Sequence, residues 1–231
     1  MIEIIPSDTR GAANHGWLDS RFSFSFADYY DANRMGFGPL RVINEDYIEA
    51  GTGFGTHPHR DMEIVTYMVE GELEHKDSMG NGSVMRAGEM QRMTAGTGVL
   101  HSEMNPSDQK THLLQIWILP EITGLEPGYE QKMFDRGSKL NRWCLLGSRE
   151  GNNGSLTVHQ DVSILATILE ADQSLDYEFA DGRIGYLQVV RGELTINGDH
   201  ISAGDGAQVS STDKVELKAQ DESEVLLFDM T

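Results

Sequence analysis

The sequence predicts an all-β protein built from two similar β-domains. Six stretches mix β-branched, aromatic or leucine residues with polar ones, and each is bounded by Gly, Asn, Asp or Pro, as strands are. They cover residues 38–48, 64–74, 113–119, 162–169, 186–196 and 224–228. Amphipathic helices of ordinary length are hard to find, which argues against a βαβ architecture. The 25 glycines supply the turns that a sandwich or barrel of short strands requires.

An internal repeat predicts that the chain contains two domains of similar construction. Gly71-Glu72-Leu73 matches Gly192-Glu193-Leu194, at an offset of 192 − 71 = 121 residues. Downstream, Ala87-Gly88-Glu89 matches Ala203-Gly204-Asp205 in the same order. A stretch between residues 135 and 155 is rich in Gly, Ser, Asn and charge, which is typical of a linker. We therefore expect an N-terminal domain over residues 1–137 and a C-terminal domain over residues 138–231.

The charge balance restricts the partners of the protein. The chain carries 18 Lys and Arg against 37 Asp and Glu, a formal net charge of −19 at pH 7. Nucleic acids and anionic membrane surfaces attract basic proteins, so this excess of carboxylates argues against both. We expect a small-molecule partner, and we expect the protein to be a monomer.

Cysteine content and the apolar runs predict a cytoplasmic location. The lone Cys144 excludes an internal disulfide and a thiolate metal cluster, which favours a reducing compartment. The first residues lack a cationic segment followed by a long apolar one, and no run of about 18 apolar residues occurs. We interpret Cys144 as a packing residue.

Two short motifs carry the residue types that bind metals. In His57-Pro-His59 the imidazoles stand at i and i+2, and His101-Ser-Glu103 repeats this spacing with a carboxylate. Because side chains alternate along a strand, each pair projects from one face of a sheet. If the two strands are neighbours, about 4.8 Å apart, the four donors converge on one metal ion. An isolated His-x-His would more often be structural, but the second motif makes a metal site the better interpretation.

The donor set indicates an open, reactive site. Nitrogen and carboxylate donors without thiolate suit Fe(II), Mn, Ni, Co or Cu, whereas closed structural zinc sites more often use cysteine. Three neutral imidazoles and one carboxylate leave a divalent ion with a formal charge of about +1, which favours an anionic oxygen ligand from a substrate. The other histidines lack a partner at metal spacing and are expected to be hydrogen-bonded or exposed: His15, His75, His112, His159 and His200.

Longer patterns around these histidines resemble a known superfamily. Gly51-x5-His57-x-His59-x3-Glu63-x7-Gly71 resembles the first cupin motif, and Gly98-x2-His101-x3-Asn105 resembles the end of the second. Gly96-Thr-Gly98 stands where cupins commonly have Pro-x-Gly, and Glu63 precedes its glycine by one residue more than usual. Glu103, two residues after His101, therefore resembles the fourth ligand more than Glu63 does.

This arrangement is similar to the pirin family of bicupins. The similarity extends to many segments of the N-terminal half and more weakly to the C-terminal half. They include His15-Gly-Trp-Leu-Asp19, Phe24-Ser-Phe-Ala-Asp-Tyr-Tyr-Asp31, Met35-Gly-Phe-Gly38, Leu40-Arg-Val-Ile-Asn44, Ala95-Gly-Thr-Gly-Val-Leu-His-Ser-Glu103 and Val158-His-Gln-Asp161.

The resemblance implies two tandem cupin domains, each a jelly-roll β-barrel, with one divalent transition metal in the N-terminal domain. Fe(II) is expected first, with Mn, Ni, Co, Cu and Zn as alternatives, and the implied ligands are His57, His59, His101 and Glu103. The repeat offset of 121 carries His57 and His59 onto Glu178 and Ala180, so the C-terminal cupin is expected to lack a metal site.

The resemblance also implies an activity. Bacterial pirins are associated with quercetin 2,3-dioxygenase activity, in which O2 opens a flavonol and carbon monoxide is released. In such an enzyme Glu103 is the expected catalytic base for the flavonol hydroxyl proton. The alternative is an iron-binding regulatory or redox-sensing pirin that binds protein partners. A third class, a cupin similar to sugar isomerases, is disfavoured only by the pirin-specific motifs of this chain.

Overall fold

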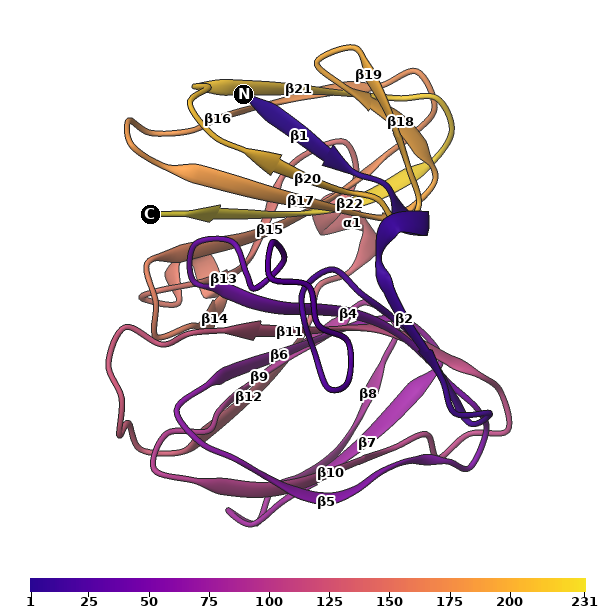
Figure 1. Ribbon diagram of the computed structural model, residues 1–231, viewed down its shortest axis with the longest axis vertical. Helices are drawn as coiled ribbons and strands as arrows, with labels where there is room; N and C mark the ends of the chain where they lie inside the picture. Colours follow the sequence, from indigo (N-terminus) through magenta and orange to yellow (C-terminus); the bar gives the residue numbers. More distant parts are fainter. The chain divides into compact units, whose positions relative to one another are not determined.

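The computed structural model describes all 231 residues and confirms the all-β prediction (Figure 1). The chain forms two compact units. The N-terminal unit consists of Gly11–Met133 and Leu156–Gln160, and the C-terminal unit of Met1–Arg10, Phe134–Ser155 and Asp161–Thr231. The division into domains 1–137 and 138–231 stays a prediction.

The N-terminal unit contains two antiparallel sheets. Its strands are β2 (Gly11–Asn14), β3 (Leu18–Phe22), β4 (Leu40–Ile48), β5 (Gly53–His59), β6 (Glu63–Glu70), β7 (Glu72–Asp77), β8 (Gly82–Arg86), β9 (Glu89–Thr94), β10 (Val99–Met104), β11 (Thr111–Ile118), β12 (Gly128–Met133) and the short β14 (Leu156–Thr157). The larger sheet has the order β12-β9-β6-β11-β4-β3-β2, and the four-stranded sheet has the order β5-β10-β7-β8 (Figure 1). Leu18, Met68, Leu73 and Leu113 form part of a buried core to which both sheets contribute.

The C-terminal unit repeats this plan. Its elements are β1 (Ile2–Ile5), the 3-10 turn η1 (Ser7–Thr9), α1 (Arg136–Lys139), β13 (Cys144–Ser148), the 3-10 turn η2 (Asn152–Gly154), β15 (Val162–Leu169), β16 (Ser174–Glu178), β17 (Ile184–Arg191), β18 (Glu193–Ile196), β19 (Asp199–Ser202), β20 (Gly206–Val209), β21 (Lys214–Ala219) and β22 (Ser223–Met230). One sheet runs β1-β20-β17-β22-β15-β13, and the other runs β16-β21-β18-β19. The N-terminal residues belong to this unit because β1 pairs with β20, with Ile2 opposite Val209. No helix has the length and apolar character needed to cross a membrane.

Two predicted strands are in fact hairpins. The stretches 64–74 and 186–196 each turn sharply at a glycine, between β6 and β7 and between β17 and β18. Gly71 and Gly192 have φ of +78° and +82°, a conformation that favours glycine. A Cβ atom would lie 2.7 Å from the Thr111 hydroxyl oxygen at Gly71 and 2.5 Å from that of Ser223 at Gly192. The repeated Gly-Glu-Leu segment therefore marks the same turn in both units.

Candidate metal centre and its cavity

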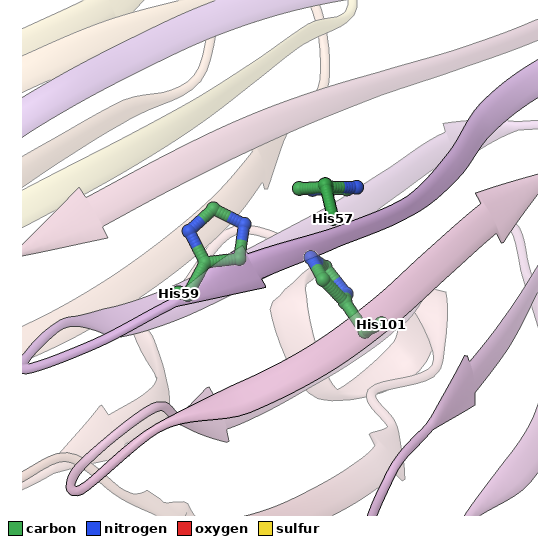
Figure 2. Close-up of side chains that lie close together, drawn as sticks. All are labelled: His57, His59 and His101. Atoms are coloured by element: carbon green, nitrogen blue, oxygen red, sulfur yellow. The ribbon is translucent and has the colours of Figure 1, made fainter.

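Two neighbouring strands bring the predicted histidines together. β5 carries His57 and His59, and β10 carries His101, which pairs directly opposite His57. Figure 2 shows the three imidazole rings pointing toward one another from these two strands. Their ring centroids lie 4.4 to 4.9 Å apart, and one nitrogen of each ring lies within 4.8 Å of the others. This spacing can hold a metal ion between the three side chains.

The nitrogen atoms of these rings are suited to metal binding. His101 is 1% exposed, yet neither ring nitrogen has a hydrogen-bond partner. Burial, followed by the neighbouring His57, lowers the pKa of His59 to about 4, and burial, followed by His57 and His59, lowers the pKa of His101 to about 3. Both rings are therefore neutral at pH 7, which is the form that binds a metal. The donor set fits a divalent ion.

The backbone fixes the orientation of His57. Its Nδ1 lies 2.8 Å from the carbonyl oxygen of Gly55. Because a carbonyl can only accept, Nδ1 carries the proton and Nε2 has the free lone pair. Gly55 also lies in a β-bulge, since β5 has two residues between Phe54 and His57 while β10 has only one, Ser102, between Glu103 and His101.

Glu103 lies on β10 near this cluster but does not belong to the group of three. Its side chain accepts hydrogen bonds from Gln115 Nε2, at 3.2 Å to Oε1 and 3.1 Å to Oε2. Thr66 Oγ1 is 3.5 Å from Oε1. Burial raises the pKa of Glu103 to about 7, and the hydrogen bonds from Gln115 oppose this shift. A carboxylate with this pKa can accept and release a proton near neutral pH.

A large cavity adjoins the histidines within the N-terminal unit. It has a volume of about 730 Å³ and is bordered by His57, His59 and Glu103. Six aromatic side chains form much of its wall: Trp17, Phe22, Phe26, Tyr29, Phe54 and Trp117. Flat apolar walls with a few polar groups are typical of pockets that bind planar aromatic ligands.

Sequence reasoning missed a row of buried polar side chains across the larger sheet. Gln115 lies opposite Thr66, and Thr66 lies opposite Gln91. Gln91 Nε2 donates to Thr66 Oγ1 at 3.2 Å, and Thr66 Oγ1 donates to Gln115 Oε1 at 3.3 Å. The signal in the sequence was Gln115, a polar residue in the middle of an otherwise apolar stretch. That stretch forms β11, which is buried almost throughout. The row holds Gln115 in place to bind Glu103.

The remaining histidines have the ordinary roles expected of them. His75 Nε2 lies 3.0 Å from Asp77 Oδ2, and His112 Nε2 lies 3.0 Å from Glu45 Oε1. His200 is exposed near Glu193, and His15 is an exposed residue at the cavity. The sulfur of Cys144 is half-buried beside Ser138.

Glu63 has a structural role in the N-terminal unit. Its side chain is fully buried, and Oε2 accepts from the backbone N–H of His159 at 3.2 Å and contacts its Nδ1 at 3.2 Å. Nearby, Arg92 Nε donates to the carbonyl oxygen of Thr157 at 2.6 Å. These contacts hold residues 156–160 in the unit, and Glu63 is not part of the group formed by His57, His59 and His101.

The C-terminal unit has different residues at the equivalent positions. In the N-terminal unit His57 is opposite His101, and Glu103 is opposite His75. The matching strand pairs place Tyr177 opposite Val215, and Leu217 opposite Ile196. The equivalents of His57, His101 and Glu103 are thus Tyr177, Val215 and Leu217, which belong to an apolar core.

This register corrects the sequence alignment by one residue. A constant offset of 121 assigned Glu178 to His57 and Ala180 to His59. The strand pairing instead gives Tyr177 for His57, and the backbone N–H of Phe179 bonds to Asp213 where His59 pairs with Val99. The shift arises in the loop that follows the strand, because four residues, 180–183, connect Phe179 to β17, whereas three residues, 60–62, connect His59 to β6.

The two sheets of each unit and the histidine cluster define a bicupin with one candidate metal centre, and comparisons with known proteins agree. A family model described as Pirin matches residues 6–118, and one described as Quercetinase C-terminal cupin domain matches residues 145–230. The chain belongs to the pirin family.

Full-length relatives extend this assignment. A protein of Escherichia coli strain K12 named quercetin 2,3-dioxygenase is 51% identical over 233 residues, which cover 100% of this chain and 99% of the relative. A pirin-like protein of Caulobacter vibrioides is 38% identical over 230 residues and is covered to 99%, as is this chain. The crystal structure of the bacterial pirin YhhW from Escherichia coli in complex with nickel(II) matches with a TM-score of 0.95 at 50% identity, covering 100% of this chain and 99% of that one.

Proposed function

We propose that this protein is a metal-dependent dioxygenase that cleaves flavonols such as quercetin with O2 and releases carbon monoxide. The observation that carries the proposal is the cluster of His57, His59 and His101 at the border of a cavity with aromatic walls. The full-length relative at 51% identity, which is named for this reaction, supports the same activity.

We assign the metal to His57, His59 and His101 with Glu103 as the fourth ligand. His101 supports this role because both of its buried nitrogens have no other partner. We propose Fe(II) as the native ion and nickel(II) as the first alternative to test, because the YhhW crystal structure contains nickel(II). When bound, the ion supplies Lewis acidity and a site at which O2 chemistry can occur.

The side chains of the chain itself position the substrate and move its proton. The aromatic walls can stack on a flat flavonol and exclude water from it. When Glu103 is released from the metal, its carboxylate can take the proton of the flavonol hydroxyl, because a carboxylate within hydrogen-bond reach of that proton can act as a general base. Gln115 donates to both oxygens of Glu103 and so keeps the carboxylate in one orientation.

We further propose that the protein acts as a cytoplasmic monomer, with the metal domain at residues 1–137 and a structural domain at 138–231. The lone Cys144 supports a reducing compartment. The apolar residues Val215 and Leu217 support a structural role for the second domain, since they cannot ligate a metal.

Flavonol-dependent oxygen uptake tests the proposal. Protein reconstituted with Fe(II), and separately with Ni(II), is mixed with quercetin in an oxygen-electrode cell. We expect O2 to be consumed in a one-to-one ratio with quercetin by wild type, and Glu103→Gln to react about 10² to 10⁴ times more slowly, as is typical when a general base is lost. Absence of uptake with both metals would favour a regulatory pirin that binds proteins.

A further inference from the structure

A polar corner of the cavity lies on β3 and β4, outside the histidine cluster. We define the polar corner as Ser20, Asn44 and Asp46, which all border the cavity and are at most 3% exposed. Strand pairing places Ser20 opposite Asp46, and Ser20 Oγ donates to Asp46 Oδ1 at 2.5 Å. Asn44 projects from the same face of β4 as Asp46, because the two residues are separated by one position.

The side-chain oxygen of Asn44 is buried and has no hydrogen-bond partner. Its neighbour across the strands, Gln115, cannot supply one, since Gln115 Nε2 already donates to both oxygens of Glu103. A buried acceptor without a donor is unfavourable, so a hydrogen bond donated to it would be stabilising. Since Asn44 borders the cavity, the missing donor can come from a molecule bound there.

The surroundings indicate the chemistry of that molecule. Phe22 lies opposite Asn44 on β3 and stacks with Tyr29 at a centroid distance of 6.2 Å. Phe26 meets Trp117 edge-on at 5.3 Å. Oxygen acceptors among aromatic rings suit a flat aromatic ligand whose hydroxyl groups donate hydrogen bonds. The corner presents a carboxylate and an amide oxygen, so it favours phenols over ligands that carry only acceptors.

We propose that the polar corner is a specificity site that recognises phenolic hydroxyls of the substrate other than the one beside the histidines. Asn44 Oδ1 and the Asp46 carboxylate accept hydrogen bonds from hydroxyls on the outer rings of a flavonol. This inference rests on the proposed function and adds to it a preference for polyhydroxylated flavonols over the parent compound 3-hydroxyflavone, which has no outer-ring hydroxyl.

Binding measurements without O2 test the inference separately from turnover. Dissociation constants of quercetin and 3-hydroxyflavone are measured on metal-loaded protein by quenching of tryptophan fluorescence. Asn44→Leu removes the acceptor at similar volume, and we expect it to weaken quercetin about three- to tenfold, the value of one neutral hydrogen bond, while 3-hydroxyflavone is unaffected. Asp46→Asn, which keeps the volume of the side chain, should show the same selectivity.

Tyr47→Phe is the matched control. It removes one hydroxyl from the same strand, but Tyr47 does not border the cavity and its hydroxyl contacts Glu45 instead. Both flavonols should bind this variant as they bind wild type. The thermal midpoint of Asn44→Leu should not fall, because the lost oxygen makes no hydrogen bond within the protein.

Each outcome has a distinct meaning. Loss confined to quercetin in Asn44→Leu and Asp46→Asn supports the specificity site. Equal losses for the two flavonols, or none, would overturn it and leave the proposed function standing. If wild type binds neither flavonol, both the specificity site and the proposed function are wrong.

Discussion

Gln115 on β11 donates from Nε2 to both carboxylate oxygens of Glu103 on β10, at 3.2 and 3.1 Å. The two residues come from different sheets of the N-terminal unit, so this contact joins the sheets at the candidate metal centre. Such partners of a metal ligand fix its orientation and adjust its affinity for the metal.

Gln115→Met should therefore weaken metal binding. Without its donor, the Glu103 carboxylate loses a fixed orientation and becomes harder to ionise, and we expect metal affinity to fall about 10- to 100-fold. Competition with a chromogenic chelator measures the effect. Gln131→Met is the matched control, because Gln131 also binds a glutamate, Glu89, at 3.1 Å but lies outside the cavity. Equal affinities in wild type and Gln115→Met would contradict the proposed role.

Glu103 should give the metal-free protein a characteristic pH dependence. Its pKa is about 7 in the folded protein against 4.5 ordinarily, so between these values the folded state holds a proton that the unfolded chain has lost. Its contribution to stability consequently falls as pH rises, by about 1.4 kcal/mol per pH unit. Glu103→Gln removes this term.

Urea unfolding at several pH values compares the two proteins. Between about pH 5 and 6.5, the free energy of unfolding of Glu103→Gln minus that of wild type should increase by about 1.4 kcal/mol per pH unit. His59 and His101 have lowered pKa values and act in the opposite direction, but both proteins contain them and their effect cancels in the difference. Glu126→Gln, an exposed control, should run parallel to wild type. If the free energy of unfolding of Glu103→Gln also runs parallel to that of wild type, the raised pKa of Glu103 is refuted.

Each histidine of the cluster should be necessary for metal retention. Replacing His57, His59 or His101 with Ala removes a nitrogen donor, and elemental analysis after dialysis should show much less than one metal per chain. His112→Ala is the control, since His112 is paired with Glu45 and stacked on Tyr47. A full metal content in the double variant His57→Ala, His101→Ala would exclude these residues as ligands.

Glu63 should matter for stability but not for the metal. Glu63→Leu leaves Arg92 and the backbone N–H of His159 without the Glu63 carboxylate as a partner. We expect the free energy of unfolding to fall by about 3 kcal/mol. Urea unfolding measures this loss, and elemental analysis should show unchanged metal. Glu72→Gln breaks an exposed ion pair with Arg86 and should cost under about 1 kcal/mol. Loss of metal from Glu63→Leu without a loss of stability would instead indicate that Glu63 is a metal ligand.

The residues that could be predicted from sequence are those whose geometry is local. His57 and His59 share a face because strands have a period of two, and the second motif on β10 needed only a neighbouring strand. The turns at Gly71 and Gly192 were missed because an apolar residue stands two positions to either side of each glycine, as in a continuous strand, and only the positive φ reveals the hairpin.

The rest of the site depends on pairing that no local pattern encodes. Gln115 meets Glu103 only because two sheets face each other, and Asn44 lies beside Gln115 through the register of β4 and β11. The bulge at Gly55 likewise depends on how β5 pairs with β10, and a constant repeat offset could not reveal it.

The carbon monoxide yield is the most direct measurement of the proposed activity. Metal-replete wild type is given a known amount of quercetin in the presence of O2, and the gas released is quantified against the quercetin consumed. We predict a ratio near one for wild type, and negligible release from the double variant His57→Ala, His101→Ala under the same conditions. Quercetin consumption without carbon monoxide, or equal release from both proteins, would contradict a flavonol dioxygenase centred on these histidines.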